Sequence, residues 1–311
     1  MIFTIALIAV AVLLLTAVPG FLLIKCKIIN EDCTVGFSKI LLYVTQPCLA
    51  IYTFKSTEYS LSKLADIGVF ALLTLGIHAI MLLSSFLIFR RSYKKVIYRI
   101  ITISNTFGNC AFFGIPVIEA LLPESAPDLI IFTTVYALVM NVLGWTVGSA
   151  IISQDTKYIT LKKIFINPAI IGTFTALILF IFEIPIQKDL FSMITSTARM
   201  ATPLSMLIMG MRLGTMSLKS MFTDIKVYFT VAVKQIVMPL IAFAALLALP
   251  ISPEVKCTFF IICACPAASI VLNYAEIVGE GQKEAANIVL FGTILSIVTL
   301  PAIMLLLPFL M

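Results

Sequence analysis

The sequence predicts an all-α integral membrane protein, and three observations support this fold class. Apolar residues make up 61% of the 311 residues and charged residues only 12%, whereas soluble domains contain about 45–50% and about 25%. The apolar residues come in blocks of about 20, the length of a helix that crosses about 30 Å of hydrocarbon. Every connection is short, so we expect a single membrane transporter domain over residues 1–311.

About ten blocks are expected to form transmembrane helices. The first is too long for the apolar part of a signal peptide, and no clear cleavage site follows Pro19 and Gly20, so it is taken as a helix. The remaining blocks have the same character and follow one another closely. In chain order, the predicted spans cover residues 2–24, 35–54, 65–89, 99–122, 129–152, 163–182, 190–213, 225–249, 255–278 and 285–309.

The Lys and Arg residues are unequally shared between the connections. Cytoplasmic connections are enriched in these residues, so the odd-numbered connections are expected in the cytoplasm and both termini outside, in a multi-pass protein of the cell membrane. Topology then explains the net charge of +6 without a nucleic-acid partner. The odd-numbered connections hold Lys25, Lys27, Lys39, Arg90, Arg91, Lys94, Lys95, Arg99, Lys157, Lys162, Lys163, Arg212, Lys219, Lys226 and Lys283, and the even-numbered ones hold Lys55, Lys63, Lys188 and Lys256.

The prolines indicate two inverted repeats of five helices, about 1–155 and about 156–311. A duplicated unit of five helices enters the membrane in the opposite direction the second time, as in many transporters. Three pairs of prolines, each in corresponding spans, are separated by a nearly constant offset of about 150 residues. The pairs are Pro19 with Pro168, Pro47 with Pro203, and Pro116 with Pro266.

The fourth and ninth spans are predicted to be helices that are broken near the middle of the membrane. Gly108, Gly114 and Pro116 interrupt the fourth span, and Pro266 interrupts the ninth. Proline removes a helix donor, and glycine lets the chain leave helical geometry. Irregular backbone at membrane depth is tolerated only in a protein interior or beside a cavity. The two breaks are therefore the expected substrate site.

Polar side chains gather at both breaks. Asn105 and Asn109 lie in the fourth span, and Ser269, Asn273 and Tyr274 follow the break in the ninth. Together with half-helix N-termini, which carry free amides, they are candidates for binding an anion. The alternative is that they only cross-link helices or pair with freed carbonyls, as most polar residues in membranes do.

Four further side chains are candidates for charge compensation or coupling. Arg199 and Lys234 lie inside predicted spans, where a cation is costly and favours an anionic substrate, unless the side chains reach the interface or cap carbonyls. His78, the single histidine, is a candidate proton carrier or a hydrogen-bonded core residue. Gln46 beside Pro47 is a candidate for coupling, or it forms a hydrogen bond between helices. Coupling to a proton or to sodium is left open.

No enzyme or metal site is predicted. The sequence has no HExxH, GxSxG or glycine-rich phosphate loop, and its seven cysteines form no zinc pattern. We expect no cofactor. The alternatives to a transporter are a channel, which would show a filter or ring motif, and a sensor of small anions, which would carry an output domain.

Three stretches of the sequence resemble the auxin efflux carrier family, in its bacterial organic-acid permease branch. They are NTFGNCAFFGIP in the fourth span, NVLGW in the fifth, and the tail from ACPAAS through GQKEAANIVLFGTILSIVTLP. The resemblance covers essentially the whole chain. The long cytoplasmic loop of the plant carriers between helices five and six is absent, as is their second proline in the ninth span, so auxin is not the expected substrate.

The resemblance implies a fold and a mechanism. Family members have ten helices in two inverted repeats of five, and their broken helices four and nine cross at prolines in the middle of the membrane. They also have a scaffold made largely of helices one, two, six and seven, and an elevator-like movement. Asn109 and Pro116 would then belong to the crossing that holds the substrate carboxylate, and Pro266 to its other half. We expect a secondary active transporter, or permease, for a small organic anion such as a mono- or dicarboxylate. Its other surroundings are membrane lipid, and the sequence leaves a homodimer open.

Overall fold

The computed structural model describes residues 1–155, 166–216, 221–222 and 224–311, and within these ranges the regular structure is helical. Six helical segments are long and apolar enough to cross a membrane. The predicted cytoplasmic residues Lys157, Lys162, Lys163 and Lys219 lie outside the described residues. The six segments are Ile2–Lys25, Cys33–Lys55, Leu61–Ser92, Ala126–Ser153, Ile225–Ala248 and Gln282–Phe309.

Several of these long segments are not uniform α-helices. Three of them contain a π-helical turn, which inserts an extra residue into the helix and is frequent at functional sites. The segments consist of α1 (Ile2–Lys25); α2 (Cys33–Ile40), η1 (Leu41–Thr45) and α3 (Gln46–Lys55); α4 (Leu61–Phe89) and η2 (Arg90–Ser92); α7 (Ala126–Leu143), η3 (Gly144–Gly148) and α8 (Ser149–Ser153); α14 (Ile225–Ala232), η5 (Val233–Val237) and α15 (Met238–Ala248); and α18 (Gln282–Ile303) and η6 (Met304–Phe309).

The remaining predicted spans contain shorter helices, three of them as pairs. Pro203, which has no backbone N–H, lies in the first turn after the interruption at Met200. Asn167 caps the helix that Pro168 begins, because its side-chain oxygen accepts the Ala169 N–H at 2.9 Å. The shorter helices are α5 (Val96–Thr106) with α6 (Gly114–Leu121), α10 (Pro168–Ile181), α11 (Lys188–Arg199) with α12 (Ala201–Thr215), and α16 (Pro253–Ala264) with α17 (Ile270–Val278).

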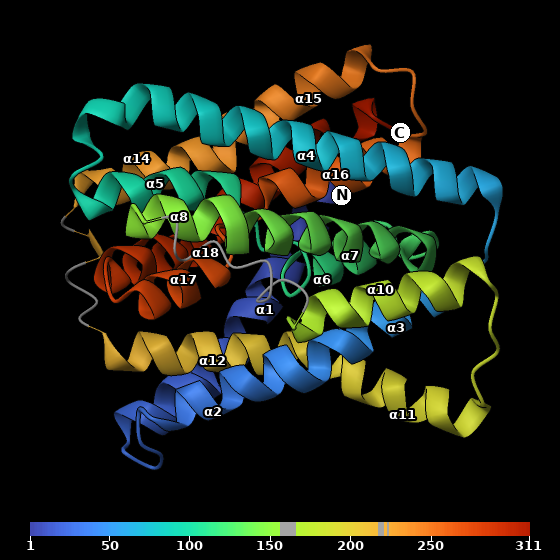
Figure 1. The fold of residues 1–311 in the computed structure, drawn as a ribbon, viewed down its shortest axis with the longest axis horizontal. Helices are drawn as coiled ribbons and strands as arrows, with labels where there is room; N and C mark the ends of the chain where they lie inside the picture. Colours follow the sequence, from blue (N-terminus) through green and yellow to red (C-terminus); the bar gives the residue numbers. More distant parts are fainter. Residues whose placement is uncertain (156–165, 217–220, 223) are drawn as a thin grey trace.

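The helices pack in two groups (Figure 1). Helices α1, α2–α3, α10 and α11–α12 contact one another, and we call them the α1–α12 group. Its central contact is very close: a Cβ on Gly210 would lie 1.8 Å from the Ala17 carbonyl oxygen of α1. Helices α4 to α8 and α14 to α18 form the second group, the crossing group, with α4 and α15 on the side away from α12 and α2.

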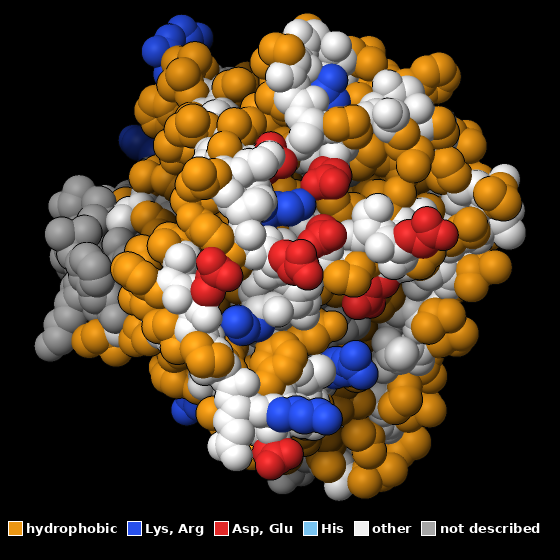
Figure 2. All heavy atoms as spheres, turned by 90° about the vertical axis from the view of Figure 1, so that its right-hand side faces the viewer, with side chains coloured by type: hydrophobic (Ala, Val, Ile, Leu, Met, Phe, Trp, Pro, Cys, Tyr) orange, Lys and Arg blue, Asp and Glu red, His pale blue; other side chains and the backbone are white. Residues whose placement is uncertain are grey.

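The surface fits a protein surrounded by lipid on its sides. Large apolar side chains lie exposed along several helices, among them Leu72, Leu83, Ile178 and Leu240, which is far more apolar surface than a soluble protein exposes. Figure 2 shows the end of the molecule at which α4 and α11 begin, with charged side chains gathered in the middle of the face and apolar ones around them. The charged groups thus lie at an end of the helices, where a membrane protein meets water.

Candidate functional site

Two broken helices cross at the centre of the crossing group. Helix α5 ends at Thr106 and α6 begins at Gly114, while α16 ends at Ala264 and α17 begins at Ile270. The two segments that link these half-helices run antiparallel and are joined by two backbone hydrogen bonds. The Asn109 N–H donates to the Pro266 carbonyl at 2.8 Å, and the Ala268 N–H donates to the Phe107 carbonyl at 2.9 Å. We call residues 107–109 and 266–268 the crossing.

The residues at the crossing explain why both helices break there. Cys265, which precedes Pro266, has extended backbone (φ −64°, ψ 149°), as expected for a residue before proline. Gly108 pairs with Ala267 at a point where little room exists, because a Cβ on Gly108 would lie 3.0 Å from Lys234 Nζ and 3.3 Å from the Tyr136 hydroxyl. The predicted breaks are therefore confirmed, with Gly108 and Pro266 as their local causes.

The four half-helices form two pairs around the crossing. Helix α5 packs against α17, and both contact α8. Helix α6 packs against α16. The two halves of each broken helix therefore lie on opposite sides of the crossing, each beside one half of the other broken helix. The carbonyl ends of α5 and α16 and the amide ends of α6 and α17 all converge on the crossing, and these ends carry the partial charges of the helix dipoles.

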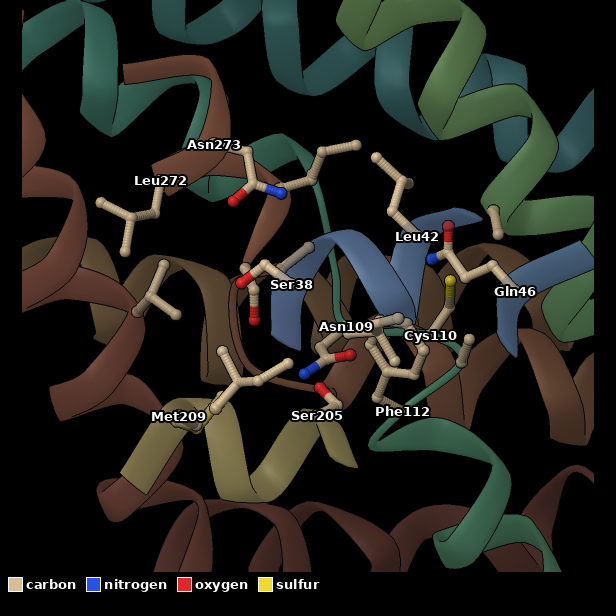
Figure 3. Close-up of a pocket in the computed structure, with 18 of the residues that line it drawn as sticks. Ser38, Leu42, Gln46, Asn109, Cys110, Phe112, Ser205, Met209, Leu272 and Asn273 are labelled. Atoms are coloured by element: carbon tan, nitrogen blue, oxygen red, sulfur yellow. The ribbon is translucent and has the colours of Figure 1, made fainter. Parts of the chain in front are cut away.

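A cavity of about 80 Å³ lies beside the crossing, between the two helix groups. Its walls come from the crossing loops, from α7, α17 and α18, and from α2–α3 and α12 of the α1–α12 group. Figure 3 shows polar side chains from several of these elements around one space. The polar side chains in its lining are Ser38, Gln46, Asn109, Asn141, Ser205, Arg212, Ser269 and Asn273.

Asn109 offers a free hydrogen-bond donor at this cavity. Its backbone is fixed by the crossing, and its side chain is only 3% exposed. Its amide nitrogen Nδ2 is buried and has no hydrogen-bond partner among the described residues. A buried donor without a partner is costly, so this amide is well placed to bind an acceptor such as a carboxylate oxygen.

Arg212 is the one side chain with a formal charge among the described residues that line the cavity. Its Nη1 donates to Glu276 Oε1 at 3.0 Å, and its Nη2 donates to Asn273 Oδ1 at 3.2 Å. Sequence reasoning assigned Arg212 to a cytoplasmic connection and missed it as a site residue. The signal that could have revealed it is its position inside the predicted span 190–213, where a cation is costly.

The predicted site residues are only partly brought together by the structure. Asn109, Ser269, Asn273 and Gln46 line the cavity. Asn105 is buried in the last turn of α5 and does not appear in the described lining. Gly114 and Pro116 lie in the first turn of α6, Pro266 forms part of the crossing itself, and Tyr274 packs edge-on against Trp145 at 5.1 Å between ring centroids.

Lys234 and His78 contact the crossing without lining the cavity. Lys234 is 1% exposed, and its Nζ donates to the Cys263 carbonyl at 3.3 Å. The His78 ring lies 4.9 Å from the Tyr136 ring, and its Nδ1 pairs with the Thr74 carbonyl at 2.6 Å. These two side chains therefore pack against the crossing residues, Lys234 beside Gly108 and His78 beside Phe107, and do not contribute to the cavity wall.

Arg199 lies away from the cavity, on an exposed part of α11. Within the described ranges, no group of three or more His, Cys, Asp or Glu side chains could hold a metal ion. The arrangement at the cavity consists of amide, hydroxyl and guanidinium groups, which bind anions by hydrogen bonds and charge.

Comparison with known families gives one match that extends over both halves of the chain. A family model described as "Membrane transport protein" matches residues 5–161 and again residues 154–304. Together the two matches cover almost all of the sequence. No curated protein matches it.

Proposed function

Because the chain belongs to this family of membrane transport proteins, the auxin efflux carrier family, we propose that it is a secondary active transporter for a small organic anion. The substrate class is a mono- or dicarboxylate. The binding site is the cavity beside the crossing, with Asn109, Ser269 and Asn273 on the side of the broken helices and Gln46 on the opposite side. The site lies in the cell membrane, with both chain termini outside.

The observation that carries this proposal is the free amide of Asn109. It is buried and has no hydrogen-bond partner among the described residues, and Asn109 lines a cavity shared by both helix groups. Arg212 supplies a positive charge at the same cavity. A neutral donor and a cation at one small cavity favour an anion over a neutral or cationic substrate.

We further propose ten membrane crossings in two inverted repeats. The crossings are the six long segments and the four shorter ones, α5–α6, α10, α11–α12 and α16–α17. The broken pairs α5–α6 and α16–α17 occupy corresponding places in the two halves. Their antiparallel pairing at the crossing is what an inverted duplication requires.

The position of the cavity supports an elevator-like mechanism. Its walls come from the crossing group on one side and from the α1–α12 group on the other. A rigid movement of the crossing group along the α1–α12 group would carry the bound anion from one side of the membrane to the other. A proton on His78 or Lys234, or sodium held by the freed carbonyls, would provide the coupling. Each chain contains a whole cavity, so this mechanism needs only one chain and is compatible with a homodimer.

Uptake into proteoliposomes tests this function. Radiolabelled monocarboxylates, dicarboxylates and amino acids are offered to the purified protein under imposed proton or sodium gradients. We expect saturable uptake of a carboxylate that responds to a gradient. Current that rises linearly with voltage and does not saturate would instead indicate a channel, and binding without flux would indicate a sensor.

A further inference from the structure

Arg212 reaches the cavity from the α1–α12 group. Ser205, Ile208, Met209 and Arg212 of α12 all line the cavity. Residues with this spacing share one face of a helix. The face of α12 that points toward the crossing therefore ends in an arginine.

The present partners of Arg212 both belong to α17 and leave it room to bind more. Its hydrogen bonds to Glu276 and Asn273 use two N–H groups, whereas a guanidinium has five N–H donors. The side chain of Arg212 is 14% exposed, but that of Glu276 is 48% exposed. Ion pairs with an exposed partner contribute little to stability, so another carboxylate can replace Glu276 at small cost.

Arg212 and Asn109 approach the same cavity from opposite helix groups. Asn109 presents a donor without a partner, and Arg212 presents a planar group that matches a carboxylate in charge and shape. An acid in the cavity would meet both. A neutral molecule of the same shape carries no charge with which to displace Glu276, so Arg212 would stay paired with Glu276.

We propose that Arg212 is the specificity-determining residue of the site and that Glu276 takes the place of the substrate carboxylate when the cavity is empty. An incoming organic acid displaces Glu276 from Arg212, so the guanidinium is paired in both states. A neutral analogue cannot make this exchange, and the site rejects it. This inference rests on the proposed function, since it concerns the same cavity.

The test compares acids with their amides. Succinate, lactate and pyruvate, each beside its carboxamide, are titrated calorimetrically into the purified full-length protein. We expect the parent protein to bind at least one acid more than about tenfold tighter than its amide. In Arg212→Gln, the acid should bind about 10- to 100-fold more weakly, and its preference over the amide should fall to within about twofold.

Two further variants test the inference even if Arg212→Gln does not fold, and a third serves as the control. Glu276→Gln removes the competitor and should tighten acid binding about two- to fivefold. The double variant Arg212→Glu/Glu276→Arg can re-form the ion pair, but we expect no recovery of acid binding, because the cation has left the cavity wall. Arg91→Gln, on the exposed turn Arg90–Ser92, is the matched control and should leave binding unchanged.

The outcomes separate this inference from the proposed function. If the parent binds none of the acids, the proposed function is contradicted and the inference with it. If the parent binds an acid but Arg212→Gln or the double variant keeps the parent's preference for acid over amide, only the inference is overturned. Unchanged or weaker acid binding in Glu276→Gln contradicts the role given to Glu276.

Discussion

The ammonium group of Lys234 lies 3.3 Å from the carbonyl oxygen of Cys263, in the last turn of α16. It also lies beside Gly108, which follows the end of α5. The carbonyl ends of two half-helices thus meet a buried cation. Because such ends carry partial negative charge, Lys234 stabilises the convergence of α5 and α16 at the crossing.

Lys234→Met should therefore weaken the crossing. Methionine fills a similar space, but the Cys263 carbonyl would lose its charged donor. We expect the free energy of unfolding to fall by about 1–3 kcal/mol, with a parallel loss of saturable uptake. Denaturation of the purified protein and uptake into proteoliposomes measure the two effects. Lys188→Met, at the exposed start of α11, is the control, and equal behaviour of the two variants would contradict this role.

Close packing of α1 on α12 gives a second prediction. A Cβ on Gly210 would lie 1.8 Å from the backbone oxygen of Ala17, so Gly210→Ala must push the two helices apart. We expect a loss of about 1–3 kcal/mol in the free energy of unfolding. Gly36→Ala, where a Cβ would meet nothing within 4 Å, should cost nothing or stabilise α2 by up to about 1 kcal/mol. A stable Gly210→Ala protein would show that this contact is looser than described.

The cysteines of the first connection report the orientation of the chain. Cys26 and Cys33 are exposed, whereas Cys48 is half-buried and the other four are buried. If this connection is cytoplasmic, a membrane-impermeant maleimide should label inverted vesicles and leave intact cells unlabelled. The double variant Cys26→Ser/Cys33→Ser should lose the signal, and Cys48→Ser should keep it. Labelling of intact cells that depends on Cys26 and Cys33 would reverse the proposed orientation.

The sequence predicted the breaks of the fold well because their causes are local. Pro266 disfavours helical backbone at Cys265 before it, and Gly108 lies where a Cβ would be tightly packed, 3.0 Å from Lys234 Nζ. The crossing of the two breaks was implied by the family resemblance, whereas the backbone hydrogen bonds of Asn109 and Ala268 that form it were not predicted. The π-helical turns were not predicted, because no single residue type determines them.

The site was predicted less completely because position along a span does not determine which way a side chain faces. Asn105 and Asn109 are close in sequence, yet only Asn109 has left the helix and lines the cavity. Tyr274 follows Asn273 directly and faces Trp145 instead. Arg212 was assigned to a connection because it lies near the end of a span, but its side chain turns out to line the cavity and to donate to Glu276 and Asn273 of α17.

Saturable uptake by Asn109→Ala compared with the parent protein tests the central claim most directly. The substitution removes the free amide at the cavity but leaves the backbone hydrogen bond to Pro266, which needs only the main chain. We predict a protein that melts at nearly the parent temperature and shows at least a tenfold lower kcat/KM for the transported acid, a loss of about 1.4 kcal/mol. Unchanged uptake kinetics in the folded variant would contradict the assignment of the crossing cavity as the substrate site.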